Sequence, residues 1–453
     1  MGPHSGERPG LVPFQNFFAV LGYAVFCCVL IVCVAEGAAR IAWPLYENLS
    51  SPFRRAGPAK ENLLKHRRGG GGFLSSLFSD PWLDATSANP AYDGYAWAEE
   101  FWKEQRARVS LEDSPPPYEP FRIWGTPKLQ GKYFNVDETP TGTFRRTANV
   151  LRPGCEQQQT LKVWFFGGST AWGPGVPDFA TIQSYLSEKL NADSESCVEV
   201  INMGVDGYAS NQELIYLYQN LKAGLRPDVV IFYDGYNDAH IGSVDPGIPA
   251  AHWDYPLIKA KFESSIVSWP NLNTRSYLLR IMNGLRRRYQ RHGVEPPSEQ
   301  GRISRARATL DNYDANLRLV ELLVKQYGFH AHFFWQPCLV YGAKPLAPFE
   351  RALHDMGTDH RAIQAVYEEA ERRSASSGRF IFLGDVFGQT REPVYIDWVH
   401  LAPRGNELVA AAIGATLQPA LRGALPAANS NPQFHSAPGQ GLMADWATPP
   451  ARH

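Results

Sequence analysis

Four polar side chains stand just beyond stretches of sequence that read as buried strands: Ser169, Asn237, Asp397 and His400. The stretches before them are short and apolar, and each is followed within two residues by a glycine. Ligands of open α/β sheets bind beyond the carboxyl ends of the strands. We therefore expect these four side chains to meet at one edge of a sheet.

Ser169 is the candidate nucleophile. A serine hydroxyl attacks weakly until a neighbouring base takes its proton. The Gly167-Gly168 pair that precedes it allows a sharp turn, which would expose the hydroxyl at the start of a helix. The alternatives are a serine that caps a helix and a loop that cradles phosphate. The lysine of a P-loop is missing, which disfavours nucleotide binding, and the G-x-S-x-G elbow is also absent.

Asp397 precedes His400 by three residues, so that a carboxylate and an imidazole can face the same cleft. In a catalytic triad the aspartate orients the histidine and stabilises its protonated form. The alternatives are a pair of metal ligands and an aspartate that caps a helix. Because the chain lacks another obvious His/Asp cluster at strand ends, the metal site is the weaker interpretation, and the sequence implies no cofactor.

Two further positions could stabilise an oxyanion. The backbone N–H of Gly204 can come close to a reacting carbonyl, and the amide of Asn237 supplies a second donor. One such donor stabilises a transition state by about 2.7–4 kcal/mol. Alternatively, Asn237-Asp238 is only a turn or a helix cap. Four neighbours of these sites are candidates for substrate contact: Asp206, Tyr208, Trp335 and Gln336.

Strand-like and helix-like stretches alternate from residue 160 onward. The predicted strands are 163–166, 197–202, 228–233, 330–335 and 380–383. The predicted helices are 180–190, 211–223, 308–327, 360–374 and 404–417. This alternation is typical of a parallel sheet with helices on both faces.

The remaining segments fall outside this alternation. Residues 1–16 form a short tail, residues 38–159 a linker and strap, and residues 422–453 a tail that we expect to be disordered. Within the strap, 87–110 reads as an aromatic-rich helix and 118–150 as irregular or β-rich. An insertion at 240–305 contains Trp253, Tyr255 and Trp269 and then a basic run. It is either a substrate lid, a surface that meets a membrane or polyanion, or a solvated insertion.

Residues 17–35 form an uncharged apolar run of about 19 residues, near the ~20 that a spanning helix needs. We expect a transmembrane anchor at 17–37. A cleaved signal peptide and a buried core helix are the alternatives, although the apolar part of a signal is usually shorter. Basic residues follow the run, which by the positive-inside rule would keep the rest of the chain in the cytoplasm. Large domains translocate regardless of such charges, and we expect an extracytoplasmic domain.

Overall composition excludes some classes of protein. The chain has 453 residues and a formal net charge of −1, with 44% hydrophobic and 20% charged residues, which allows a sizeable core. Nothing in it predicts a nucleic-acid partner. No cysteine pattern of the zinc type occurs. Cys155 and Cys197 each precede a predicted strand, and those strands should be neighbours, so the two thiols are either disulfide-bonded or free.

Four short segments, taken in order, resemble the signature blocks of the SGNH, or GDSL-like, hydrolases: Gly-Gly-Ser-Thr, Asn-Met-Gly-Val-Asp-Gly-Tyr, Gly-Tyr-Asn-Asp and Asp-x-x-His. The resemblance spans residues 160–421. It implies the SGNH hydrolase fold, a flavodoxin-like three-layer α/β/α sandwich with a central parallel sheet. Many family members have aspartate where this chain has Gly168, and the Gly-Gly-Ser-Thr version resembles the membrane-anchored members.

The resemblance also implies a role for each residue of the blocks. Ser169 would be the nucleophile, His400 the general base and acid, and Asp397 the residue that orients His400. The N–H groups of Ser169 and Gly204 and the side chain of Asn237 would form the oxyanion hole. The implied activity is hydrolysis of an acyl ester, with acetyl favoured, on a glycan or lipid of the cell envelope. Transfer of the acyl group to a polysaccharide and an inactive binding module in envelope assembly are the alternatives.

Overall fold

The computed structural model describes these residues: 14–50, 86–111, 116–139, 141–155, 158, 160–193, 197–244, 249–253, 255, 258–259, 278, 281, 297–355 and 359–423. They belong to two compact units, and each unit is considered by itself. One unit contains the long helix α1. The other unit contains the sheet and every predicted site residue.

Helix α1 (Phe14–Ser50) is 37 residues long and contains the predicted anchor. Its segment Val25–Ala42 has a mean hydropathy of 2.2, and only 6% of that segment is buried. At 1.5 Å per residue, 18 residues cover about 27 Å, near the thickness of the bilayer core. The helix is therefore long and apolar enough to cross a membrane, and a signal sequence near the N-terminus would have the same properties.

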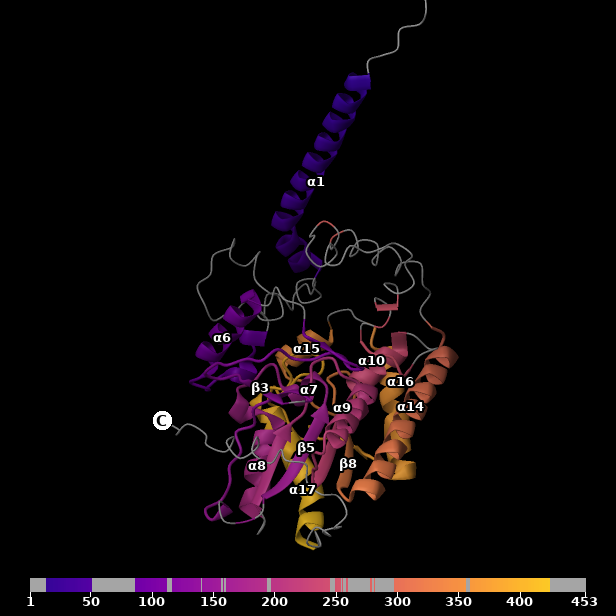
Figure 1. Cartoon of the computed structure of the whole chain (residues 1–453). Coiled ribbons are helices and arrows are strands. Elements are labelled where there is room, and N and C mark those ends of the chain that lie inside the picture. Colours follow the sequence, from indigo (N-terminus) through magenta and orange to yellow (C-terminus); the bar gives the residue numbers. More distant parts are fainter. Residues whose placement is uncertain are drawn as a thin grey trace, which may run out of the picture. The chain divides into compact units, whose positions relative to one another are not determined.

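The other unit is built on a mixed sheet of seven strands (Figure 1). In spatial order the strands are β3 (Val136–Thr139), β4 (Gly142–Arg145), β6 (Cys197–Asn202), β5 (Thr160–Gly167), β7 (Val229–Asp234), β8 (His330–Trp335) and β9 (Ile381–Phe382). The five strands from β6 to β9 are parallel. Numbered along the chain they have the order 2-1-3-4-5, which is the flavodoxin-like order.

The strap contributes more to this sheet than the sequence predicted. Strands β3 and β4 pair with each other antiparallel, and β4 joins β6 through the pair Arg145 and Asn202. The expectation of a purely parallel sheet was therefore wrong at this edge. Two more strap strands, β1 (Tyr118–Glu119) and β2 (Ile123–Trp124), form a separate antiparallel pair. Short strands with little alternation carry a weak sequence signal, which explains the difference.

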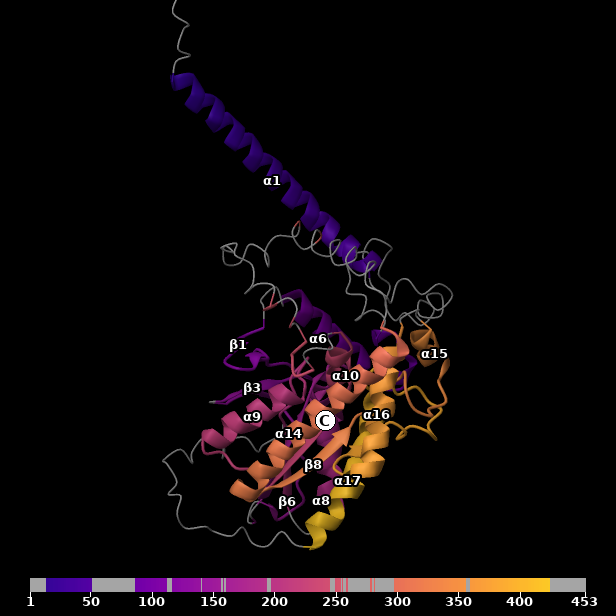
Figure 2. The same ribbon diagram turned by 90° about the vertical axis from the view of Figure 1, so that its right-hand side faces the viewer.

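Helices cover both faces of the sheet (Figure 2). On one face lie α8 (Ile182–Asp193) and α17 (Pro403–Gly423). On the other lie α9 (Ser210–Lys222), α14 (Glu299–Tyr327) and α16 (Arg361–Ser377). The side chains of β5 alternate between the two cores: Val163 and Phe165 face the first set of helices, whereas Trp164 and Phe166 face the second. The three-layer α/β arrangement follows from this double burial.

Further helices of the second unit include η1 (Pro90–Tyr92), α6 (Ala98–Leu111), α7 (Ser169–Trp172), η3 (Asp178–Ala180), α10 (Tyr236–Val244) and α15 (Pro348–His354). The single helix predicted at 87–110 is divided into η1 and α6. Gly94 lies between these two helices, and its left-handed φ of +88° interrupts the helical conformation. Helix α14 begins nine residues earlier than predicted because Ser298 caps it, accepting the Gly301 N–H at 3.1 Å.

Cys155 and Cys197 form a disulfide, which was one of the two interpretations of the sequence. The bond ties the chain before β5 to the first residue of β6, the strand beside it. Much of the predicted insertion at 240–305, including Trp269 and the basic run, lies outside the described residues. The predicted tail at 422–453 also lies outside them, apart from its first two residues, which end α17.

Candidate active site

Ser169 is the first residue of α7 and follows the carboxyl end of β5 by two positions. Gly168, between them, is extended, with φ −78° and ψ −150°. Helix α7 ends after one turn at Gly173, whose left-handed φ of +76° turns the chain away. The strand–turn–helix context therefore places the Ser169 hydroxyl at the carboxyl edge of the sheet, where the backbone N–H groups of a first helical turn have no partner within the helix.

Asp397, His400 and Ser169 form a continuous chain of hydrogen bonds. His400 Nε2 lies 2.7 Å from Ser169 Oγ, and His400 Nδ1 lies 2.6 Å from Asp397 Oδ2. The other oxygen of Asp397 accepts the N–H of Val399 at 2.9 Å and that of His400 at 2.8 Å. The carboxylate therefore fixes both the imidazole and the loop that carries it. Such an arrangement can remove a proton from Ser169.

The charges within this chain of bonds alter its acid–base properties. Burial raises the pKa of Asp397, but the charge and hydrogen bond of His400 outweigh burial and lower it to about 2. Burial lowers the pKa of His400, and the charges of Asp397 and Asp206 more than compensate, so that the pKa lies above its ordinary value. A stabilised imidazolium is what a histidine needs in order to hold the serine proton during reaction.

Asn237 lies on the first turn of α10, directly beside the turn that carries Ser169. Its Nδ2 donates to the carbonyl of Tyr208 at 2.7 Å. A Cβ atom added at Gly168 would come closer than 3.0 Å to Asn237 Nδ2 and would lie 2.8 Å from Tyr208 O. The amide of Asn237 therefore packs against the residue before Ser169. Only glycine fits at position 168 without displacing Asn237 or the carbonyl of Tyr208.

Gly204 lies against Ala171 and Trp172 of α7, and its N–H, which was expected to serve the oxyanion hole, has another partner. The N–H donates to Asn202 Oδ1 at 2.9 Å, and Asn202 in turn donates to the carbonyl of Ala171 at 3.0 Å. A Cβ at Gly204 would lie 2.6 Å from Trp172 N. In this structure Gly204 allows the loop after β6 to pack against α7, a role that the sequence analysis missed.

The four candidate substrate-contact residues divide into two groups. Trp335 is fully buried among Tyr313, Tyr367 and Phe380, which corrects the expectation that it lines the substrate site. A strand-end tryptophan in a short apolar run gives no signal of which face it takes.

Tyr208 is also buried, at 1% exposure, and its hydroxyl donates to the carbonyl of Trp124, so its ring is structural. Gln336 is buried and accepts the Thr170 hydroxyl at 2.7 Å, which holds the residue that follows Ser169. Asp206 alone of the four is exposed. Asp206 is therefore the candidate that remains open to a substrate.

Two polar groups distant in sequence hold the loop that carries Asp397. Asn89 Nδ2 donates to the carbonyl of Tyr395 at 2.9 Å. Glu350, fully buried in α15, accepts the N–H groups of Val394 at 2.9 Å and Tyr395 at 3.1 Å, and it pairs with Lys344 at 2.6 Å. The loop therefore gets its position from the strap and from α15, neither of which the sequence analysis connected with the site.

Arg145 holds the loop that follows α7. It is fully buried, pairs with Asp178 at 3.2 Å and donates to the carbonyls of Trp172 and Gly173. Burial lowers the pKa of Arg145 to about 10, while Asp178 opposes this effect. A lone arginine in the strap has no local motif, so this support for α7 could not be recognised from sequence.

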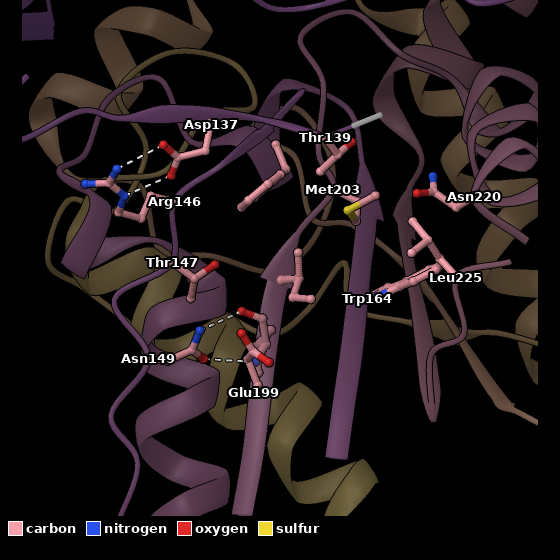
Figure 3. Close-up of a pocket in the computed structure, with 13 residues that line it drawn as sticks. Asp137, Thr139, Arg146, Thr147, Asn149, Trp164, Glu199, Met203, Asn220 and Leu225 are labelled. Carbon is pink, nitrogen blue, oxygen red and sulfur yellow. Dashed lines mark hydrogen bonds and ion pairs between the residues drawn. The ribbon is translucent and has the colours of Figure 1, made fainter. Parts of the chain in front are cut away.

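A separate pocket lies beside β6 (Figure 3). Its apolar lining includes Trp164 and Met203, and its rim includes the ion pair of Asp137 and Arg146, which lie 2.9 Å apart. Ser169, Asp397 and His400 do not line it. Within the part of the chain that the structure describes, no group of three or more His, Cys, Asp or Glu residues could hold a metal ion.

No family model matches the chain, and no curated protein matches it. Among solved structures, it is similar to an acetyl xylan esterase, AlAXEase, at 16% identity and a TM-score of 0.31, over 57% of this chain and 100% of that chain. It is similar to Axe2, an acetylxylan esterase from Geobacillus stearothermophilus, at 17% identity and a TM-score of 0.28, over 56% and 92%. LAE5, an alpha/beta hydrolase from the metagenome of Lake Arreo, Spain, has 18% identity and a TM-score of 0.30, over 56% and 94%.

Proposed function

We propose that this chain is a serine esterase of the SGNH type, in which Ser169 attacks the carbonyl of an acyl ester. The observation that carries the proposal is the hydrogen-bonded series from Ser169 through His400 to Asp397, with separations of 2.7 and 2.6 Å. A buried carboxylate, an imidazole and a serine in this order form the constellation used for acyl transfer on several unrelated folds. An inactive binding module would have no use for this geometry.

In the first half of the reaction, Ser169 Oγ bonds to the ester carbon while its proton passes to His400 Nε2. Asn237 Nδ2 and the N–H of Ser169 would donate to the oxygen that becomes negative, and each such donor stabilises the transition state by about 2.7–4 kcal/mol. The bond to the alcohol oxygen then breaks, and His400 gives its proton to that oxygen. The alcohol leaves, and the acyl group remains on Ser169.

In the second half, His400 removes a proton from water, whose oxygen attacks the acyl carbon. The bond to Ser169 Oγ breaks, and the proton returns from His400 to the serine. The products are the free acid and the original enzyme. A sugar hydroxyl in place of water would give acyl transfer by the same steps.

We propose an acetyl ester on a glycan or lipid of the cell envelope as substrate, with the domain outside the cytoplasm. The hydropathy of Val25–Ala42 supports an anchor that holds the enzyme at a membrane. The disulfide between Cys155 and Cys197 supports an oxidising compartment, because such bonds rarely persist in the cytosol.

Hydrolysis of p-nitrophenyl acetate by the full chain in detergent tests the proposal, with p-nitrophenyl octanoate as a long-chain comparison. We expect turnover by the wild type, preference for acetate, and loss of turnover in Ser169→Ala. A fluorophosphonate should label the wild type and leave the variant unlabelled.

Ser376→Ala is the matched control, because Ser376 is an exposed helical serine whose hydroxyl contacts only a backbone carbonyl of its own helix, at 3.2 Å. Undiminished turnover in Ser169→Ala would refute the assignment of the nucleophile. A folded wild type that neither turns over nor reacts with the fluorophosphonate would instead favour the binding module.

A further inference from the structure

Four aromatic side chains from three separate segments form a ridge next to the candidate active site: Trp124, His240, His252 and Trp253. Trp124 comes from the strap, His240 from α10, and the other two from the insertion. The ring of Trp253 stacks on that of His240, with centroids 4.1 Å apart and planes inclined by 15°. Trp124 and His252 meet edge to face at 5.7 Å.

One end of this aromatic ridge lies near Asn237, the side chain that would bind the oxyanion. His240 follows Asn237 by three residues on the same helix, so the two side chains emerge from one face with Cβ atoms about 5–6 Å apart. Asn237 packs against Gly168, the residue before the nucleophile. Trp253 therefore stacks on a residue that lies one helical turn from Asn237, the group that would bind the oxyanion.

The other end is hydrogen-bonded to the backbone of Asp206. The indole N–H of Trp124 donates to the carbonyl of Asp206 at 2.9 Å, and a Cβ at Gly207 would touch the Trp124 ring at 3.3 Å. The charge of Asp206 acts on His400. The aromatic ridge thus adjoins the loop 206–208, in which the side chain of Asp206 is exposed.

We propose that the aromatic ridge is a subsite for the alcohol part of the ester, and that this part is a pyranose sugar. This proposal rests on the proposed esterase function and specifies the class of its substrate. Trp253 is 40% exposed although one face of its indole is covered by His240, so apolar surface is left open beside the site. The apolar C–H face of a pyranose packs on such a ring, while its hydroxyls need acceptors at the edge, and Asp206 is placed to provide one.

A lipid chain fits this surface less well. Acyl chains require continuous apolar lining, whereas this surface combines two indole rings with the polar ring nitrogens of His240 and His252 and the carboxylate of Asp206. The mixture of one flat apolar face and a few polar groups is instead suited to a ligand that is itself amphipathic.

Kinetics with two acetate esters test the proposal: methyl β-glucopyranoside tetraacetate, which presents a pyranose, and p-nitrophenyl acetate, which does not. We expect Trp253→Ala in the full chain to lower the ratio of kcat/KM for the sugar ester to that for the phenyl ester by about tenfold. Trp253→Phe should retain most of the ratio. Tyr327→Ala is the matched control, since Tyr327 is 37% exposed and lies at the end of α14 that precedes β8, at the opposite edge of the sheet.

An unchanged ratio in Trp253→Ala would overturn the subsite, and so would an equal loss on both esters, which would mean that Trp253 supports only the site's structure. Binding separates this proposal from the esterase function. Acetylated cellotetraose should show saturation transfer in NMR with Ser169→Ala, and the signal should weaken when Trp253→Ala is added. If the chain binds the oligosaccharide in this way but hydrolyses neither ester, the subsite would stand and the esterase function would be rejected. If a folded chain shows no saturation transfer to the oligosaccharide, the subsite would be rejected.

Discussion

Replacement of Gly168 by alanine should strongly lower the rate of ester hydrolysis, although Ser169, His400 and Asp397 are all unchanged. The backbone at Gly168 has φ −78°, a value that alanine adopts freely, so no backbone strain is introduced. The added Cβ would, however, lie closer than 3.0 Å to Asn237 Nδ2 and 2.8 Å from Tyr208 O. Aspartate, which occupies this position in many SGNH hydrolases, should meet the same obstacle.

The size of the effect follows from the contact distances. Ordinary contacts of a Cβ atom begin at 3.4 Å, so the carbonyl of Tyr208 would have to yield by 3.4 − 2.8 = 0.6 Å and the amide of Asn237 by more than 3.4 − 3.0 = 0.4 Å. Both groups lie on the same side of Gly168 and are hydrogen-bonded to each other, so they should move together. A displacement of about 1 Å at a catalytic group can lower a rate by about 10²-fold.

The assay is hydrolysis of p-nitrophenyl acetate by Gly168→Ala, Asn237→Ala and the double variant. Asn237→Ala should lower kcat by about 10²–10³, the usual effect of losing one oxyanion donor. The double variant should lose no more than about tenfold beyond Asn237→Ala, because the alanine acts by displacing an amide that is already gone. Gly388→Ala is the control, since its Cβ would be only slightly closer than an ordinary contact to one atom, the carbonyl oxygen of Asp385 at 3.3 Å, in a loop outside the site. Full activity in Gly168→Ala, or additive losses in the double variant, would refute this reasoning.

Three further predictions concern charge and covalent structure. Asp397→Asn should lower kcat by about 10⁴ and move the acid limb of the pH–rate profile to lower pH, since Asp397 raises the pKa of His400; a limb that stays in place would contradict this. Burial and the charge of Asp238 raise the pKa of Asp234 to about 8, so the folded state keeps a proton that the unfolded state releases. Stability in urea should therefore fall as the pH rises between 5 and 8, and Asp234→Asn should make that fall smaller. Replacing both Cys155 and Cys197 by serine should lower the unfolding free energy by about 4 kcal/mol, given their separation of 42 residues, and an unchanged urea midpoint would argue against that contribution.

The sequence by itself determined the parallel core of the fold. Apolar runs of four to six residues alternate with amphipathic stretches, and this period can be recognised without knowledge of distant contacts. The strands predicted at 197–202 and 330–335 match β6 and β8 residue for residue. The positions of Ser169 and of the Asp397/His400 pair after strand ends could be predicted for the same reason, because local order along the chain fixes which edge of a parallel sheet a loop reaches.

Tertiary structure alone decided which groups support those side chains. Arg145 and Glu350 hold the loops on either side of the site through hydrogen bonds to backbone carbonyls and N–H groups far away in sequence, and such contacts leave no local pattern. Burial likewise depends on which face of a strand packs inward, so the sequence could not separate the buried Trp335 from the exposed Asp206. The partner of the Gly204 N–H was undetermined for the same physical reason: hydrogen bonds between loops are selected only when the elements that carry them have packed together.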